Sequence, residues 1–132
     1  MLRWGSSTRD EGGVEERRFE VTRDGGGPIP GVVWLPPGAP QPGPLVLLGH
    51  GGAQHKAHAR MLARRDALDG IATAAIDGPV HGDRGGVSSM ADPRLAAAFA
   101  SMSTYDSIVA DWQAALDALV AERIADPERI GY

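Results

Sequence analysis

The sequence predicts an α/β fold, with a β-hairpin early in the chain and a mostly parallel sheet after it. Three short apolar segments indicate the parallel part: residues 45–48, residues 71–76 and the segment that opens at Ile130. Continuous apolar runs of this length are typical of parallel strands that helices cover on both faces. Helical patterns separate the three runs, so we expect a β-α-β-α-β order with right-handed crossovers.

The first part of the chain combines a polar segment with a hairpin pattern. Residues 1–13 are polar and show no period, so we expect a loose N-terminal arm, followed by one folded domain over residues 14–132. Residues 14–22 alternate apolar and polar side chains, as a half-buried strand does, and residues 29–35 predict its hairpin partner. Asp and Gly at 24–27 supply the turn between them.

The middle of the chain alternates loops and helices. Prolines within residues 36–44 remove backbone donors, so we expect a surface connection there. Residues 57–68 predict a helix that ends at Asp69-Gly70. Residues 77–90 contain several glycines and Pro79, which predicts a loop, and residues 92–100 predict a short helix.

A long amphipathic helix is predicted near the end of the chain. Ser103 and Asp106 have the spacing of a capping box, which favours a helix start at Ser103. Asp126-Pro127 ends this helical pattern before the strand at Ile130. Apolar side chains at steps of three and four predict one buried stripe: Ile108, Val109, Trp112, Leu116, Leu119 and Val120.

Composition excludes several classes of function. The chain has 132 residues, a formal net charge of −4, one lysine and scattered arginines, so a nucleic-acid partner is not expected. It has no apolar run that could span a bilayer and no signal-like start, which predicts no membrane partner and a cytoplasmic location. It has no cysteine and no nucleotide-binding motif, so we expect no cofactor. The bias toward Ala, Gly, Arg and Pro suggests a GC-rich bacterial source.

The strongest local signal for chemistry is the glycine-rich turn at 49–52. A backbone that presents N–H groups to an oxyanion cannot carry bulky side chains at the same place. The alternative is a glycine-rich strand-to-helix turn with no ligand. His50 in this turn is expected to hold the loop by hydrogen bonds, in preference to transferring protons. No serine of the chain lies in a G-x-S-x-G frame.

Four histidines and two aspartates leave a metal site open as an alternative, because imidazole and carboxylate suit zinc or manganese. Their spacing matches no H-E-x-x-H motif, so we expect no metal. The six residues are His50, His55, His58, His81, Asp77 and Asp83.

Three segments, taken in order, resemble the first half of an α/β-hydrolase of the dienelactone hydrolase and prolyl-oligopeptidase-like kind. They are PLVLLGHGG at 44–52, IATAAIDGPVHGDR at 71–84 and DPERIGY at 126–132. The resemblance implies the N-terminal half of an α/β-hydrolase sheet. In that family the strand entered by the third segment leads into the nucleophile elbow G-x-S-x-G, and an acid and a histidine follow. None of these is in the sequence, so we expect a hydrolase fragment or half-domain that is inactive alone.

The same resemblance implies roles for two loops. In the family, the loop after the third strand supplies one oxyanion-hole N–H, which makes Gly52 the first candidate, with Gly51 and Ala53 next. The D-x-P-x-H-G turn shapes one wall of the substrate cleft, which assigns Asp77 and His81, together with His50, to the cleft loops. From the residues alone, an Asp at this place also fits a role in satisfying backbone donors.

The resemblance implies a serine hydrolase that cleaves an ester or related acyl bond of a small molecule. This chain would supply scaffold and an oxyanion-hole loop, and a missing C-terminal half or a second chain would supply the Ser-Asp-His triad. Two alternatives stay open: a non-catalytic binding module of α/β fold, and a metal-dependent hydrolase that uses the histidines and aspartates.

Overall fold

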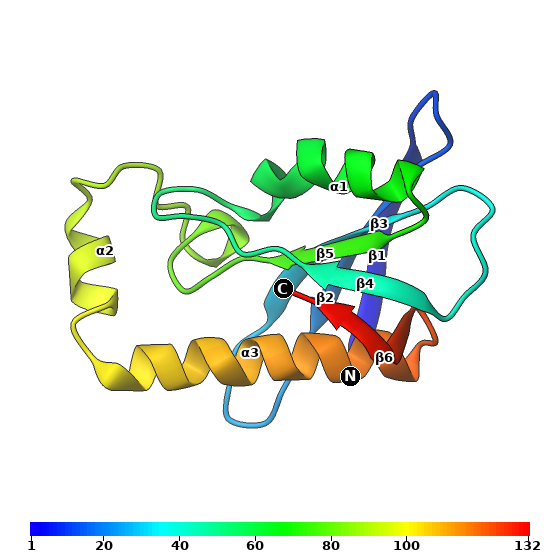
Figure 1. Cartoon of the computed structure of the whole chain (residues 1–132). Helices are drawn as coiled ribbons and strands as arrows, with labels where there is room; N and C mark the ends of the chain where they lie inside the picture. The colour runs from blue at the N-terminus through cyan, green and yellow to red at the C-terminus, as the bar shows by residue number, and fades with distance from the viewer.

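The computed structural model describes residues 1–132 and contains one mixed sheet of six strands in the order β1-β2-β3-β5-β4-β6. Helices cover both faces, with α1 on one side and α3 on the other (Figure 1). The strands are β1 (Leu2–Arg9), β2 (Glu15–Val21), β3 (Ile29–Leu35), β4 (Gly43–Leu47), β5 (Ala72–Ile76) and β6 (Ala125–Gly131). The helices are η1 (Lys56–Ala59), α1 (Arg60–Leu68), η2 (Gly82–Arg84), α2 (Pro93–Ala98) and α3 (Met102–Ala121), of which η1 and η2 are 3₁₀ helices.

The predicted α/β architecture is confirmed. Strands β2 and β3 form the antiparallel hairpin, and β3 pairs antiparallel with β5. Strand β4 pairs parallel with both β5 and β6, which gives the expected three-stranded parallel core. Parallel neighbours need crossover connections, and the segments containing α1 and α3 provide them.

The prediction of a loose N-terminal arm at residues 1–13 is wrong for most of these residues. Strand β1 pairs with β2 as an edge strand, with a register shift between Trp4 and Ser7. Trp4 packs edge-on against Phe19 at a centroid distance of 6.2 Å, and the Arg17 guanidinium lies 4.8 Å from the centre of the indole. A polar strand at a sheet edge can satisfy its inner backbone groups from its neighbour, so it needs little apolar content.

Several element boundaries differ from the sequence prediction, among them those of β4, α3 and β6. Strand β4 begins at Gly43 and includes Pro44, inside the expected surface connection. Helix α3 begins earlier than expected, because the Ser101 hydroxyl accepts the Ser103 N–H at 3.2 Å and is the true N-cap. Strand β6 begins at Ala125 and its register with β4 shifts between Gly43 and Leu45, so Ile130 lies inside the strand.

Side chains on the two faces of the sheet enter separate apolar clusters. Val33 and Leu35 belong to the cluster under α3, whereas Val32 and Trp34 belong to the cluster under α1. This is the alternation that a strand imposes on successive side chains. None of the helices combines the length and apolar composition that a bilayer crossing requires.

The predicted stripe on α3 is confirmed in part. Leu119 is fully buried, and Trp112 and Leu116 are partly buried against the same cluster. Val109, which was expected in the stripe, is 70% exposed, and the most buried side of the helix instead carries Asp111 and Ala115. The small Ala115 side chain allows the helix to approach the sheet closely there, which turns the larger residues toward its flank.

A polar contact fixes α1 against the sheet. Arg60 donates two hydrogen bonds to the Glu16 carboxylate, at 2.7 and 2.8 Å, and the Trp34 indole N–H donates a third at 2.7 Å. The hydrogen-bonded Arg60 guanidinium holds the pKa of the Glu16 carboxyl below its ordinary value, although burial acts in the opposite direction. The anchor is therefore formed by ionised Glu16.

Gly31 is predicted to be required by close packing. Gly31 lies opposite Phe19 in the β2–β3 ladder, and a Cβ at position 31 would lie 2.2 Å from the Phe19 Cζ atom. Because the ring is 4% exposed and cannot move away freely, Gly31→Ala should lower the free energy of unfolding by about 1–3 kcal/mol. Gly27→Ala is the matched control, since a Cβ at 27 meets no atom within 4 Å. Urea titrations that give equal stability for the two variants would contradict this packing argument.

The Glu16 anchor should also give a defined pH dependence. A carboxyl whose pKa is lowered by folding contributes stability above its unfolded value, near 4.5, and loses that contribution as the pH falls through the folded pKa. The difference in unfolding free energy between the wild type and Glu16→Gln should therefore be largest near neutral pH and shrink below pH 4.5. Glu11→Gln removes a carboxylate that forms no ion pair and serves as the control. A difference between wild type and Glu16→Gln that stays constant down to pH 3 would count against the anchor.

Candidate active site

Two loops leave the same edge of the sheet, because the carboxyl ends of parallel strands β4 and β5 lie side by side there. The loop at residues 48–55 follows β4, and the loop that starts at Asp77 follows β5; both extend toward α2 (Figure 1). Between these loops, α2 and α3 lies a cavity of 510 Å³. Its apolar lining comes mainly from the helices and the segment before α2: Met90, Leu95, Phe99, Ile108 and Trp112.

The structure distinguishes the three candidate oxyanion donors. The Gly51 N–H donates to the side-chain oxygen of Gln54 at 2.9 Å. The Ala53 N–H donates to His81 Nε2 at 3.1 Å. The Gly52 N–H forms no hydrogen bond, and Gly52 lines the cavity. Of the three N–H groups, only that of Gly52 is not engaged within the protein.

The turn is tight on both sides of the Gly52 Cα atom. Ala53 has a φ of 60°, in the left-handed region that residues other than glycine rarely occupy. Such a residue typically stores about 1–3 kcal/mol of strain, which the surrounding contacts must offset. A Cβ at position 52 would lie 2.7 Å from the Met90 sulfur, so any side chain there must displace Met90.

His50 joins the first loop to the second. Its Nε2 accepts the Gly78 N–H at 2.9 Å, and its Nδ1 lies 2.8 Å from the Gly51 carbonyl oxygen. A nitrogen that accepts an N–H carries no proton, so the proton sits on Nδ1 and donates to that carbonyl. Burial lowers the pKa of His50, which favours the neutral ring that both contacts need. The lone pair is engaged, which leaves His50 no free base for proton transfer.

His81 makes the reciprocal connection from the second loop. Its Nε2 accepts the Ala53 N–H, and its Nδ1 lies 2.8 Å from the Pro79 carbonyl oxygen, so this ring is also neutral and protonated at Nδ1. The ring is 2% exposed and lies 4.8 Å from the His50 ring, centre to centre. Each loop therefore contains a histidine that accepts a hydrogen bond from a backbone N–H of the other loop.

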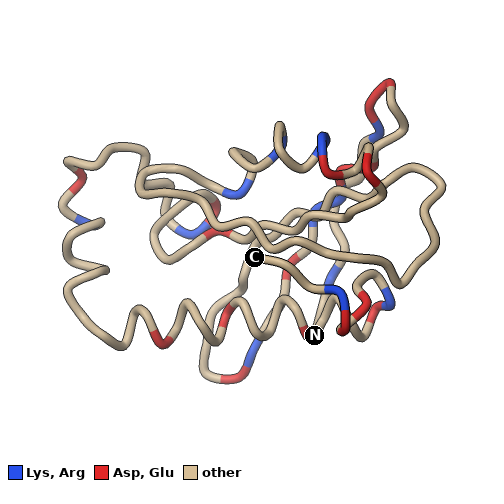
Figure 2. The backbone as a smooth tube through the Cα atoms, in the orientation of Figure 1, with Lys and Arg blue, Asp and Glu red and all other residues tan.

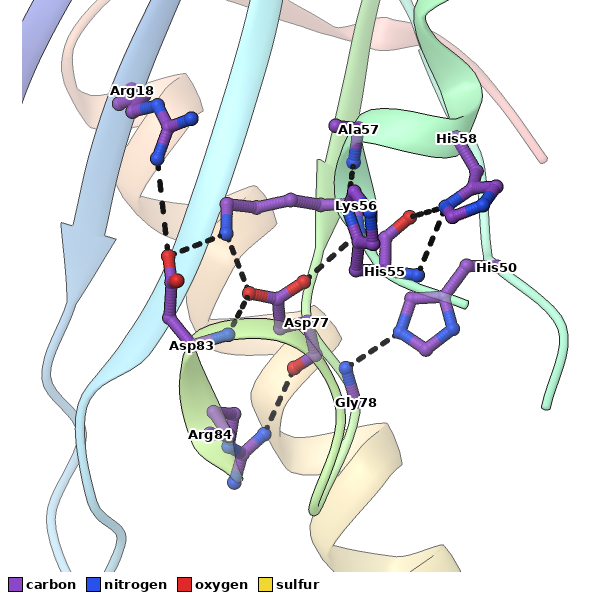
Figure 3. Close-up of polar contacts among 10 residues, drawn as sticks. All are labelled: Arg18, His50, His55, Lys56, Ala57, His58, Asp77, Gly78, Asp83 and Arg84. Atoms are coloured by element: carbon purple, nitrogen blue, oxygen red, sulfur yellow. Dashed lines mark hydrogen bonds and ion pairs between the residues drawn. The ribbon is translucent and has the colours of Figure 1, made fainter. Parts of the chain in front are cut away.

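Asp77 is fully buried and is occupied by contacts within the protein (Figure 3). Its Oδ1 accepts the Lys56 N–H at 2.9 Å, and its Oδ2 accepts the Lys56 ammonium at 2.5 Å and the Asp83 N–H at 2.9 Å. A Cβ at Gly82 would lie 2.3 Å from the carboxylate carbon, which explains the glycine at that place in the D-x-P-x-H-G segment. This coordination assigns Asp77 a structural role and gives it no free oxygen for nucleophilic attack.

Lys56 is the only lysine and is 6% exposed. Its ammonium also pairs with the Asp83 carboxylate at 2.8 Å, and this contact lowers the pKa of Asp83. No role for Lys56 was predicted from the sequence. Its position directly after the glycine-rich turn was the available signal.

A second polar cluster under the cavity was also missed. Asp111 of α3 is 2% exposed and accepts hydrogen bonds from Arg23 and Arg84, each at 2.6 Å. Arg84 also donates to the Asp77 carbonyl at 3.1 Å, so α3 is connected to the second loop. An acidic residue between apolar Ile108 and Trp112 in the helix pattern was the signal that could have found it.

The histidines and aspartates proposed as alternative metal ligands do not gather around a common point. No group of three or more such side chains lies close enough to hold an ion. His55 caps η1 by accepting the Ala57 N–H at 3.2 Å, and His58 contacts the His55 backbone. Every buried side-chain nitrogen and oxygen has a hydrogen-bond partner, so none is left unpaired for a metal.

Charged residues show no polarised surface. Figure 2 shows the Lys and Arg positions spread along the backbone and interspersed with Asp and Glu positions. A surface for nucleic acid would need basic residues gathered on one face.

Comparison with solved structures finds similar proteins among ester hydrolases. A cold-adapted esterase from an Arctic intertidal metagenomic library is 38% identical, with a TM-score of 0.74, and the match covers 95% of this chain and 53% of that esterase. A dienelactone hydrolase-like promiscuous phosphotriesterase from metagenomic libraries is 30% identical over 96% of this chain and 48% of its own, with a TM-score of 0.64. An acetyl xylan esterase from Paenibacillus sp. R4, at 23% identity and a TM-score of 0.69, matches 98% of this chain and 43% of its own.

No family model matches the chain, and no curated protein is similar to it by sequence. The structural matches agree with the mixed α/β sheet described above. The chain therefore has an α/β-hydrolase-type fold and spans about half the length of the esterases that it matches.

Proposed function

We propose that this chain is the scaffold and oxyanion-hole part of a serine hydrolase that cleaves carboxylic esters of small molecules. The observation that carries the proposal is that Gly52 lines the cavity and its N–H has no hydrogen-bond partner, whereas the N–H groups of Gly51 and Ala53 are engaged. The likeness to esterases over about half their length supports the same reading.

The chemistry that Gly52 would serve is charge stabilisation. When a serine attacks an ester, the carbonyl oxygen becomes an oxyanion in the tetrahedral intermediate, and a fixed N–H donor stabilises that charge. The attacking serine, its histidine base and the acid that orients the histidine would come from outside these 132 residues, as would the second N–H donor.

The cavity favours a neutral, apolar substrate. Its lining includes Met90, Leu95, Phe99 and Trp112, and the cationic groups nearest to it are already paired with carboxylates. An uncharged acyl or alcohol group can be buried there without leaving a charge unpaired.

A non-catalytic binding module is the second candidate, because a preformed apolar cavity can hold a ligand without any reaction. The two candidates differ in whether Gly52 affects a reaction rate. The cytoplasmic location and bacterial source stay predictions from the sequence.

The 132-residue chain alone should not hydrolyse p-nitrophenyl butyrate above the rate of a control protein with the same number of exposed histidines. An oxyanion donor without a nucleophile stabilises an intermediate that cannot form. Turnover that survives replacement of the four histidines by alanine, and that a serine-directed phosphonate abolishes, would show that the chain has its own nucleophile.

A chimera tests the proposed role directly. The segment of the Arctic esterase that this chain matches is replaced by these 132 residues, so that under this proposal the remaining part would supply the triad. The folded chimera should hydrolyse p-nitrophenyl butyrate. Gly52→Pro removes the donor and should lower kcat by roughly a hundredfold to a thousandfold, or about 2.7–4 kcal/mol.

Gly52→Ala is the matched control, because alanine keeps the N–H. Its Cβ would come close only to the flexible, exposed end of Met90, and it would meet Leu95 at 3.9 Å, an ordinary van der Waals distance. It should retain most of kcat. Circular dichroism checks that proline has not unfolded the turn. If both folded variants have equal kcat values near that of the parent chimera, Gly52 is not an oxyanion donor. A folded chimera without activity would favour the binding module.

A further inference from the structure

We propose that His81 is a positioning residue, which, together with His50, fixes the two peptide planes that flank the Gly52 Cα atom and so aims the Gly52 N–H. The proposal rests on the proposed function, in which Gly52 is the oxyanion donor. His81 touches no reacting atom in this account and acts only through the backbone.

The first plane is the peptide between Gly51 and Gly52. It contains the Gly51 carbonyl and the Gly52 N–H, which point in opposite directions in a trans peptide. His50 Nδ1 holds that carbonyl at 2.8 Å. By holding the carbonyl at one edge of this peptide plane, His50 sets the direction of the Gly52 N–H at the opposite edge.

The second plane is the peptide between Gly52 and Ala53, and His81 holds it. The Ala53 N–H donates to His81 Nε2 at 3.1 Å. Without that acceptor, the Ala53 backbone would relax toward negative φ, because its φ of 60° is unfavourable for alanine. Rotation of this plane would carry the Gly52 Cα with it and change where the preceding N–H points.

The His81 ring itself is rigidly held. It is 2% exposed, its Nδ1 proton is committed to the Pro79 carbonyl at 2.8 Å, and Phe99 packs edge-on against it at 6.2 Å. The His50 ring also packs against it, with the ring centres 4.8 Å apart and the planes tilted by 53°. Because both the position and the tautomer of the ring are fixed, its Nε2 lone pair points in one direction. A positioning residue requires this.

The two histidines cross-connect the loops in a reciprocal way. His50 follows β4 and accepts from Gly78 of the second loop, whereas His81 follows β5 and accepts from Ala53 of the first loop. Each contact spans 28 residues of sequence. Movement of either loop would therefore change the conformation of the backbone at Gly52.

The first test uses NMR on the 132-residue chain and needs no activity. A scalar coupling across the hydrogen bond should join the Ala53 amide nitrogen to His81 Nε2, and His81 should be the Nδ1–H tautomer. His81→Gln, whose side-chain oxygen can replace Nε2, should keep the Ala53 amide protected from exchange. His81→Phe should lose that protection and shift the Gly52 amide resonance. Absence of the coupling in the wild type, or the opposite tautomer, would overturn the proposal.

The second test measures kcat and KM in the esterase chimera. His81→Phe should lower kcat by about tenfold to a hundredfold, with KM within about threefold of the parent, because a misplaced donor weakens only the transition state. His81→Gln should recover most of kcat. His58→Phe, the same change at a histidine of η1 outside the cavity lining, should leave kcat within about twofold.

A double-mutant cycle separates positioning from general structural damage. In the Gly52→Pro background the donor is already gone, so His81→Phe should lower kcat by less than about threefold further. If His81→Phe lowers kcat by the same factor in the Gly52→Pro background as in the parent, the two effects are independent and the proposal is overturned. An unchanged kcat in Gly52→Pro would instead refute the oxyanion role of Gly52, while the NMR result would still report whether His81 holds Ala53. If His81→Phe does not fold, the wild-type coupling and the His81→Gln kinetics decide the question.

Discussion

The buried carboxylate of Asp77 is the contact on which the edge of the cavity depends. Asp77 directly follows β5. Its carboxylate accepts the backbone N–H and the ammonium of Lys56, which begins η1 just after the first loop, and it also accepts the N–H of Asp83 in η2. Ions buried to this extent lose their hydration, and removal of one partner typically costs about 3–5 kcal/mol because the other charge is left unpaired. The pair therefore closes the second loop and ties it to the first. Gly82 is required beside it, since no Cβ fits against the carboxylate.

The same arrangement explains how a loop of small residues can hold a defined shape. The turn at 49–53 has little side-chain packing of its own, and Ala53 is in a strained conformation. Contacts from Gln54, His50 and His81 hold its peptide planes from outside. A donor that is already fixed needs no reorganisation when charge develops nearby, which is why preorganised N–H groups stabilise oxyanions more effectively than water does.

Charge is arranged around the cavity so that its apolar lining stays intact. Asp111 lies under the cavity but is neutralised by Arg23 and Arg84, and Arg84 also binds the backbone of Asp77. This cluster connects α3 to the second loop, so the helix that contributes Trp112 and Ile108 is held in register with the loop that contributes His81. A neutral cavity bounded by fixed polar groups follows from these pairings, and it is compatible with the uncharged ester substrate proposed for the site.

The sequence by itself determined the elements whose signals are local. Residues 45–48 and 71–76 predicted parallel strands because continuous apolar runs reflect burial on both faces, and the turn at 49–52 stood out by its glycines. Only the tertiary structure decided that residues 2–9 form an edge strand, because such a strand is held by backbone bonds to β2 and carries little pattern of its own. It also decided which of Gly51, Gly52 and Ala53 keeps an unpaired N–H. That choice depends on Gln54 nearby and on His81, 28 residues beyond Ala53, and no local pattern can encode a contact that the fold must first bring together.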